Sequence, residues 1–268
     1  MQVKAPAKLN LHLEVVKKRE DGFHDLKTVF QLIDLYDDLD FELNQNSIQL
    51  KETTKKIKDN IVLKAAFLLK EKTCTNRGVT ISLNKSIPIQ KGLGGGSSDA
   101  AATLIALNHL WSTQLSKNEL LDLSLDLGSD VPFFIHGQAT WAEGRGEVFT
   151  DIDLKHEWYL LIFPKTSIST AEAFNEISIS KKEDITLQEY LSGKSINTFL
   201  NWSKNKYPEI KRIFSSMKRV GVPKLSGTGS ALFVSFSNKM DADKALKEFP
   251  NGILVKSLDH SPLRQLIE

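Results

Sequence analysis

The sequence predicts an α+β protein with two domains, on the basis of three observations. Alternating apolar and polar residues over 8–15 indicate a strand, and apolar residues at helical spacing over 61–72 and 99–111 indicate helices. A polar run over 150–156 separates these elements from a fresh apolar strand, "WYLLIF". The chain has 268 residues, 41% of them hydrophobic, which is enough for a large core. We therefore expect an N-terminal domain over 1–153 and a C-terminal domain over 154–268.

The first strand is expected to be half-buried, with one apolar and one polar face. The apolar face carries Leu9, Leu11, Leu13 and Val15, and the polar face carries Lys8, Asn10, His12 and Glu14. An Asp21–Gly22 turn follows, and residues 25–35 and 37–43 predict two more strands of an antiparallel sheet.

The remaining elements follow from caps and from apolar spacing. Asn60 caps the helix over 61–72, and Ser116 with Glu119 forms a capping box for a helix that Gly128 ends. The rest of the chain divides as follows: strand over 78–87, a turn leading into strands over 129–149, strand over 158–163, a polar irregular segment over 177–202, helix over 211–221, strand over 231–236 and helix over 241–249.

Charge and cysteine content exclude several classes of function. The 35 Lys and Arg residues nearly balance 33 Asp and Glu, so a net charge of +2 provides no general attraction for nucleic acid or for an acidic membrane. No run approaches the length of ~20 apolar residues that spans a bilayer. The single cysteine, Cys74, forms no internal disulfide, which favours a cytoplasmic protein.

The segment "PIQKGLGGGSSDAAATL", residues 88–104, predicts a phosphate site. Glycines let backbone N–H groups approach a ligand, and successive exposed amides bind anions. The helix that follows adds its free N–H groups and the positive end of its dipole, and Ser97 and Ser98 add hydroxyls. A flexible connection without a ligand is the alternative explanation.

Two better-known phosphate motifs do not fit. The segment "LQEYLSGKS" has Gln188 where the P-loop has its first glycine. The dinucleotide pattern started from Gly92 fails at Ser97, and we expect the sheet before it to be antiparallel rather than a βαβ unit.

Three separated segments resemble the GHMP kinases: "PAKLNLHL", "PIQKGLGGGSSDAA" and "LSGTGSALFVSF". The resemblance implies a two-domain GHMP kinase fold, with an N-terminal sheet-and-helix domain like that of a ribosomal protein and a smaller C-terminal α/β sandwich. The segments "GLGGGSS", "DGFHDLKTVFQLID" and "GSDVPFF" are similar to a branch that phosphorylates a cytidine diphosphate conjugate of methylerythritol in isoprenoid biosynthesis. The implied co-substrate is ATP, which carries Mg²⁺, and no separate protein metal site is expected.

The resemblance implies catalytic roles for Lys8 and Asp130. The Lys8 ammonium would neutralise charge on the transferred phosphoryl group or depress the pKa of a nearby acid or alcohol. Asp130 would act as base for the attacking hydroxyl or chiefly orient it. A solvated lysine and a turn or helix-cap aspartate are the structural alternatives.

The resemblance also implies an ATP site made of two loops. Asn60 and Lys85 would reach the adenine end of ATP, although a helix cap explains Asn60 equally well. Gln90 and Lys91 replace the family's more usual glycines, and Asp99 replaces a common asparagine and receives no catalytic role. The loop residues are Pro88, Ile89, Gln90, Lys91, Gly92, Leu93, Gly94, Gly95, Gly96, Ser97 and Ser98 on the first loop, and Gly227 and Gly229 on the second.

By the same resemblance, Phe23 and Phe174 would sandwich the cytosine ring, with stacking worth ~1 to 3 kcal/mol. His24 would read the edge of the base, and Asn10 and Thr170 would line the same side. The family usually has tyrosine where Phe23 stands, so the stacking face is kept and a hydroxyl is lost. Core packing is the structural alternative for both phenylalanines.

Two other functions are considered beside the cytidine-conjugate kinase. Another GHMP kinase, acting on homoserine, mevalonate or a sugar, would keep the phosphate loop without an aromatic sandwich. A non-catalytic module related to RNA-binding proteins would need a basic face, which the near-neutral charge does not favour. Either a monomer or a homodimer is compatible with the sequence.

Overall fold

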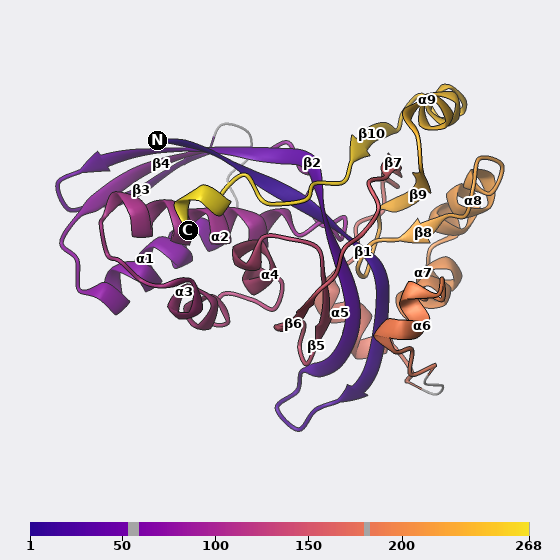
Figure 1. The fold of residues 1–268 in the computed structure, drawn as a ribbon, viewed down its shortest axis with the longest axis horizontal. Coiled ribbons are helices and arrows are strands. Elements are labelled where there is room, and N and C mark those ends of the chain that lie inside the picture. Colours follow the sequence, from indigo (N-terminus) through magenta and orange to yellow (C-terminus); the bar gives the residue numbers. More distant parts are fainter. Residues whose placement is uncertain (53–58, 180–182, 268) are drawn as a thin grey trace.

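The computed structural model describes residues 1–52, 59–179 and 183–267. Its larger sheet has the strand order β3-β4-β2-β5-β6, with β1 paired to β2 (Figure 1). Its strands are β1 (Gln2–Lys18), β2 (His24–Asn44), β3 (Ile48–Glu52), β4 (Gly78–Asn84), β5 (Thr140–Glu143) and β6 (Val148–Asp151).

Four helices pack on one side of this sheet (Figure 1). They are α1 (Ile61–Thr73), α2 (Gly95–Leu110), α3 (Lys117–Ser124) and α4 (Val131–His136). The core between them is apolar and includes Phe30, Phe41, Leu69 and Leu104, each at most 2% exposed. Helix α2 is buried along most of its length, and this central position holds the glycine-rich segment at its start in place.

The second sheet has the order β10-β7-β9-β8 and carries the remaining helices. Its elements are β7 (Trp158–Ile162), α5 (Thr170–Glu176), α6 (Leu187–Leu191), α7 (Phe199–Lys206), α8 (Pro208–Met217), β8 (Lys224–Leu225), β9 (Leu232–Phe236), α9 (Lys239–Glu248) and β10 (Ile253–Lys256). The short 3₁₀ helix η1 (Arg264–Leu266) lies in the C-terminal tail and packs against α2 of the first half. Among the described residues, no helix is long and apolar enough to cross a bilayer.

Strand β1 contributes to both halves of the molecule. Val3 lies in the core of the first sheet, whereas Leu13 packs with the apolar residues of the second. The polar face of this strand is therefore buried, and the prediction of a half-buried strand was wrong: Lys8 is 3% and Glu14 is 2% exposed. The C-terminal half bonds to the end of this face that carries Glu14, whereas Lys8 contacts Asp130 of the first half.

Polar side chains on this face accept hydrogen bonds from the backbone of the C-terminal half. The Glu14 carboxylate accepts hydrogen bonds from the backbone N–H groups of Asp184 (2.7 Å) and Ile185 (3.0 Å). His12 Nδ1 accepts one from the N–H of Ile196 (3.2 Å). These contacts join the two halves, which the alternation of residues 8–15 did not reveal.

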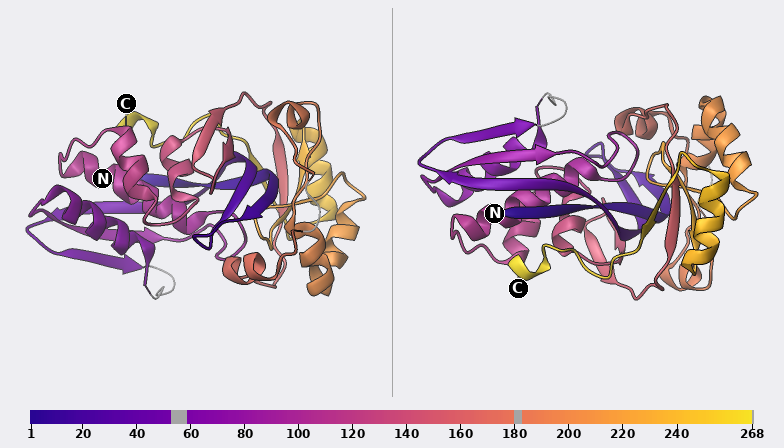
Figure 2. Two further views of the ribbon diagram at one scale, coloured as in Figure 1. Left: turned by 90° about the horizontal axis from the view of Figure 1, so that it is seen from below. Right: turned by 90° about the horizontal axis from the view of Figure 1, so that it is seen from above.

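The C-terminal tail returns to the first sheet (Figures 1 and 2). The N–H of Leu258 donates to the carbonyl of Leu32 (2.9 Å), and Leu263 is buried in the first core. The chain passes from the first sheet to the second between Asp151 and Trp158. Because β1 and the tail cross between the halves, the division of the chain at residue 153 stays a prediction.

Several local predictions hold, and others were wrong. Asn60 caps α1 and Ser116 forms the predicted capping box with Glu119. Residues 25–35 and 37–43 form one continuous strand, β2, rather than two, and α3 ends at Ser124, before the predicted stop. Strand β4 pairs in parallel with β3, and α1 connects them, so β3, α1 and β4 form a βαβ unit. The expectation of an antiparallel sheet rather than a βαβ unit before the glycine-rich segment was wrong.

Four helices were missed because their segments are short, and packing rather than length stabilises them. Helix α4 forms within 129–149, where a turn leading into strands was expected. Helix α6 lies in the segment predicted to be irregular and α7 begins in it, and α5 contains Phe174, for which no element was predicted. Residues 180–182 of the irregular segment lie outside the described residues.

Buried His12 predicts a loss of stability in acid. Its ring stacks on Trp141, and burial, then the charges of Lys224 and Lys27, lower its pKa from 6.5 to about 4. The unfolded chain therefore binds this proton more tightly, and stability that is complete above pH 6.5 is lost as pH falls toward 4. Between neutral pH and pH 5 this group should remove about 2 kcal/mol of unfolding free energy.

Urea unfolding at both pH values measures this loss, with His12→Gln as the comparison. Glutamine does not titrate in this range and retains a carbonyl acceptor for the N–H of Ile196. The wild type should lose about 2 kcal/mol more than the variant does. Equal losses would mean that His12 does not carry the pH dependence.

Candidate active site

A cavity of about 440 Å³ lies where the glycine-rich loop, strand β1 and helix α5 meet. Most of the predicted site residues line it. They are Lys8, Asn10, Asn60, Lys85, Pro88, Ile89, Gln90, Lys91, Gly92, Leu93, Gly94, Gly95, Gly96, Ser97, Asp130, Thr170, Phe174 and Gly227. Phe23, His24, Ser98 and Gly229 do not line it.

The glycine loop needs its glycines for two separate reasons. Gly92 and Gly94 have φ values of 75° and 70°, in the left-handed region that favours glycine. A Cβ on Gly92 would overlap the carbonyl oxygen of Ser226, and one on Gly94 would lie 2.7 Å from Cζ of Phe134. Gly94 is the N-cap of α2, which begins at Gly95, so the free N–H groups of the helix lie within the glycine cluster.

Lys8 and Asp130 meet beside this loop. Lys8 Nζ lies 3.3 Å from Asp130 Oδ2, and the backbone N–H of Lys8 donates to the carbonyl of Leu93 (3.0 Å). Lys8 is 3% exposed and Asp130 is 36% exposed, so the carboxylate is accessible while the ammonium is enclosed. Asp130 occupies the N-cap position of α4 but makes no side-chain cap bond, which leaves its carboxylate available.

Hydrogen bonds hold the Lys8 side chain in one position. Its Nζ donates to Asn10 Oδ1 (2.5 Å), and Asn10 Nδ2 donates to Thr28 Oγ1 (2.8 Å). The Thr28 hydroxyl donates in turn to the carbonyl of His12 (2.7 Å). A chain of buried polar groups on β1 and β2 therefore orients Lys8 toward Asp130.

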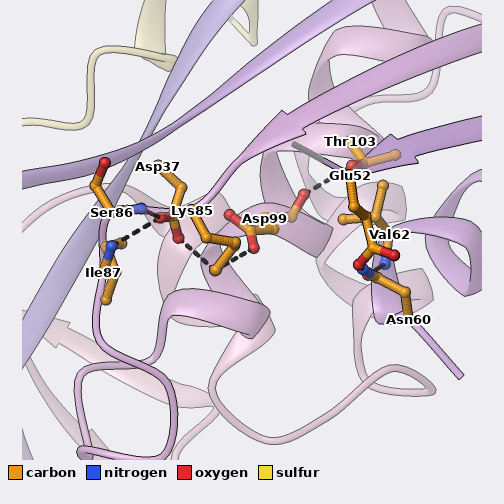
Figure 3. A network of polar contacts seen from close by, with 9 residues as sticks. All are labelled: Asp37, Glu52, Asn60, Val62, Lys85, Ser86, Ile87, Asp99 and Thr103. Atoms are coloured by element: carbon orange, nitrogen blue, oxygen red, sulfur yellow. Dashed lines mark hydrogen bonds and ion pairs between the residues drawn. The ribbon is translucent and has the colours of Figure 1, made fainter. Parts of the chain in front are cut away.

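Lys85 lies between two carboxyl groups (Figure 3). Its Nζ contacts Asp37 Oδ2 and lies 2.6 Å from Asp99 Oδ2. Burial acts to lower the pKa of Lys85, but Asp99 and Asp37 outweigh it and the pKa lies above its ordinary value. Burial raises the pKa of Asp99 to about 8, against the effect of Lys85. The lysine expected at the adenine end is thus paired within the protein.

Asn60 has two roles in the same region (Figure 3). Its Oδ1 accepts from the N–H of Val62 (2.9 Å), which caps α1, and its Nδ2 donates to Glu52 Oε1 (2.8 Å). The cap explanation for Asn60 therefore holds, and the residue also lines the cavity.

Lys91 directs its charge away from the loop. Its Nζ donates to the carbonyls of Pro164 (2.8 Å) and Thr166 (2.6 Å), and burial lowers its pKa. The lysine thus ties the loop to the C-terminal half. Ser98, predicted beside Ser97 as a phosphate donor, is fully buried, and its Oγ has no hydrogen-bond partner among the described residues.

The second loop closes the cavity from the C-terminal half. Ser226 Oγ donates to the carbonyl of Gly92 (2.8 Å), and the N–H of Ala231 donates to the carbonyl of Lys91 (3.1 Å). Thr228 lines the cavity, and its hydroxyl lies 3.5 Å from that of Thr170. The two loops are therefore in direct contact, and Gly227 faces Gly92.

The aromatic residues predicted to bind the base make two separate contacts. The rings of His24 and Phe174 lie 5.0 Å apart, and the Arg145 guanidinium lies 3.7 Å from the centre of the Phe23 ring. Phe23 remains 44% exposed. Burial, then the charge of Lys18, lowers the pKa of His24, which favours a neutral imidazole.

Sequence reasoning missed several residues that build the site: Asp37, Thr28, Ser226 and Arg145. Arg145, in "EGRGE", stands between two glycines of a predicted turn region, a pattern that could have drawn notice. No local pattern pairs Asp37 with Lys85, since 48 residues separate them. Among the described residues, no group of three or more His, Cys, Asp or Glu side chains is arranged to hold a metal ion.

Comparisons with known proteins agree with this geometry. Residues 60–138 match the model for the GHMP kinases N terminal domain, and residues 191–252 match the GHMP kinases C terminal model. Over 98% of its length the chain is 40% identical to the 4-diphosphocytidyl-2-C-methyl-D-erythritol kinase of Pasteurella multocida (strain Pm70), covering 91% of that protein. It is 39% identical to the protein of the same name from Shewanella loihica (strain ATCC BAA-1088 / PV-4), with 97% of this chain and 94% of that protein covered.

Solved structures extend the comparison. A crystal structure of 4-(cytidine 5'-diphospho)-2C-methyl-D-erythritol kinase is similar with a TM-score of 0.82 and 30% identity, covering 96% of this chain and 99% of that one. A mevalonate kinase has a TM-score of 0.74 at 16% identity, covering 97% of this chain and 100% of that one. At that identity the similarity extends to the fold alone.

Proposed function

The chain belongs to the 4-diphosphocytidyl-2-C-methyl-D-erythritol kinase family of the GHMP kinases, and from this premise we propose the reaction that it catalyses. It is a small-molecule kinase that uses ATP. The proposed acceptor is 4-diphosphocytidyl-2-C-methyl-D-erythritol, which is phosphorylated on its 2-hydroxyl to give the 2-phosphate and ADP. The contact between Lys8 and Asp130 beside the glycine loop is the observation that supports this reaction most directly.

The proposed mechanism assigns one task to each part of the cavity. The N–H groups at the start of α2 and within the glycine loop hold the ATP phosphates, with Mg²⁺ entering as part of the ATP complex. Asp130, the accessible partner, accepts a hydrogen bond from the acceptor hydroxyl and takes up its proton as the new P–O bond forms and the bond to ADP breaks. The Lys8 ammonium offsets the negative charge on the transferred group.

Enclosure of Lys8 strengthens its proposed role. An ammonium that is 3% exposed acts in a less polar environment than one in water, so its attraction for phosphate oxygens is less screened. Asn10 accepts from the same ammonium and keeps it directed at the reaction centre without neutralising it. Asn10 is accordingly a positioning residue as well as part of the proposed acceptor side.

We propose that Phe174 and His24 form one wall of the cytosine site, with Phe23 as the second stacking face. The Arg145 guanidinium covers one side of the Phe23 ring. The exposed fraction of Phe23, 44%, supports a ring that is open to a ligand. Thr170 lies one turn before Phe174 on α5, on the side of the cavity formed by the second loop.

Phe174→Ala should weaken the cytidine acceptor more than ATP. Loss of one stacking face costs about 1 to 3 kcal/mol, so KM for the acceptor should rise by roughly 5- to 150-fold while KM for MgATP stays within about twofold. Steady-state kinetics with each substrate varied in turn measures both values. Equal increases in the two KM values would indicate that Phe174 only supports the fold.

An ADP-release assay tests the function itself. Purified protein is incubated with MgATP and one acceptor: 4-diphosphocytidyl-2-C-methyl-D-erythritol, homoserine, mevalonate or a sugar. Mass spectrometry then shows whether the mass of each product has increased by one phosphoryl group. We expect turnover with the cytidine conjugate. Turnover only with another acceptor would replace the proposed substrate, and no turnover with any would contradict the proposed reaction.

The proposal includes a cytoplasmic location and no nucleic-acid partner. The single cysteine, Cys74, is an exposed free thiol, which suits a reducing compartment. The net charge of +2 supports neither a nucleic-acid ligand nor an acidic surface as partner.

A further inference from the structure

Two carboxyl groups and one ammonium lie together beside the proposed phosphate site (Figure 3). Asp37, Lys85 and Asp99 are 0%, 9% and 3% exposed in their side chains. A Cβ added to Gly95, the first residue of α2, would lie 3.3 Å from Lys85 Nζ. When both carboxyl groups are ionised, an excess of negative charge borders the helix end where polyanionic phosphates would bind, which disfavours that ligand.

The two carboxyl groups differ in how fully they are bonded. Asp37 Oδ1 accepts from the N–H groups of Ser86 (2.6 Å) and Ile87 (2.8 Å), while its Oδ2 contacts Lys85. Asp99 uses only Oδ2, toward Lys85, and its Oδ1 is buried without a hydrogen-bond partner among the described residues. A buried carboxylate oxygen without a hydrogen-bond partner raises the free energy of the ionised form, and protonation of the carboxyl group reduces this cost.

Among the described residues, Lys85 and Asp37 are the charged groups that act most strongly on Asp99. Lys85 faces it from the segment after β4 and Asp37 faces it from β2, and both act on its titration. Helix α1 packs against α2 with Val62 and Ala65, which are apolar. On the other side of the loop, a Cβ on Gly94 would lie 3.1 Å from Cε of Lys8. Lys85 and Lys8 therefore flank the start of α2.

We propose that the ATP phosphates bind to the form of the site in which Asp99 is protonated, and that Asp99 takes up a proton from solvent where it was ionised before binding. The Lys85 ammonium is then shared with the phosphates instead of with two carboxylates. The proton is bound on the Asp99 carboxyl group, whose Oδ1 has no partner among the described residues. Lys85 stays bonded to Asp37 and is thereby held next to Gly95. This inference rests on the proposed use of ATP but not on the identity of the acceptor.

Asp99 and Lys85 would thus act on nucleotide affinity rather than on the chemical step. A static bridge that only fixes α2 to β4 predicts a different behaviour, because it would exchange no proton on binding. The ordinary pKa of an aspartate would leave Asp99 ionised throughout, but burial raises it to about 8. Nucleotide binding should therefore become weaker as pH rises above 8, by up to about tenfold per pH unit.

Calorimetry measures the proton directly. Mg²⁺ with a non-hydrolysable ATP analogue is titrated into the protein near pH 9, in buffers of different ionisation enthalpy, and the dependence of the observed heat on the buffer gives the number of protons taken up. We expect the wild type to take up a large part of one proton. Asp99→Asn, which resembles the protonated acid, should take up none and should bind with an affinity that is constant between about pH 7 and 9.

Glu14→Gln is the matched control, because Glu14 is also buried and bonded but lies outside the cavity. It should take up as many protons as the wild type. Absence of proton uptake in the wild type would overturn the proposal even if Asp99→Asn failed to fold, and so would equal uptake in Asp99→Asn. Failure of the wild type to bind the analogue would contradict the use of ATP, whereas binding without proton uptake would contradict only this inference.

Discussion

Asp130→Asn should lower kcat by roughly 10²- to 10⁴-fold, the usual contribution of a group that accepts a proton in the transition state. Asparagine keeps the size of the side chain but cannot take up the proton of the attacking hydroxyl. Asp130 makes no cap bond to α4, so the substitution removes no helix contact. Binding of MgATP should be retained, because the nucleotide contacts are proposed on the glycine loop and not on this residue.

The ADP-release assay with the cytidine conjugate measures kcat, and calorimetry with Mg²⁺ and the ATP analogue measures nucleotide binding. Asp122→Asn is a suitable control, because Asp122 is an exposed aspartate on α3 away from the cavity. It should leave kcat within about twofold of the wild type. If Asp130→Asn kept kcat within the same range, Asp130 would have no part in the chemical step.

Gly92→Ala should destabilise the protein and abolish tight nucleotide binding. The residue has φ 75°, where a non-glycine residue costs roughly 1 to 3 kcal/mol. The new Cβ would also overlap the backbone carbonyl of Ser226, which cannot rotate away. Relief of this overlap requires the two loops to separate, and the contact between Ser226 Oγ and the carbonyl of Gly92 would be lost with it.

Gly96→Ala is the control from the same loop. Gly96 lies in the first turn of α2 with no positive φ, and its new Cβ would meet only Ile61 Cγ2 at 3.8 Å. The unfolding free energy of Gly96→Ala should equal that of the wild type or exceed it by up to about 1 kcal/mol. Urea unfolding compares the two variants. Equal stability of Gly92→Ala and Gly96→Ala would mean that the loops are not packed against each other.

Local features of the sequence are sufficient to predict the elements that depend only on neighbouring residues. A cap acts over three residues, so Asn60 and Ser116 identify the starts of α1 and α3. A cluster of glycines before an alanine-rich run likewise identifies a glycine-rich loop at a helix start, because both the positive φ angles and the free N–H groups belong to adjacent residues. Anion binding by that loop stays a prediction. The resemblance to the GHMP kinases added the reaction, which these patterns do not contain.

Only the tertiary structure decides which partner a side chain meets across a long stretch of chain. The polar face of β1 reads as solvent-exposed, yet the fold buries it. The C-terminal half bonds to Glu14, and Lys8 is enclosed beside Asp130 and the glycine-rich loop. Lys91 looks like a ligand for phosphate but bonds to carbonyls of the other half. Helix α4 has the composition of a strand, and packing of Phe133 and Phe134 in the core makes it a helix.

The sequence alone thus determined the glycine-rich loop at a helix start and the capped helices α1 and α3, because these depend on neighbouring residues. The tertiary structure decided which charged groups meet at the site. Lys85 pairs with Asp37 and Asp99 because β2, α2 and the segment after β4 come together. Burial then changes the energies of those charges, and burial is a property of the whole fold.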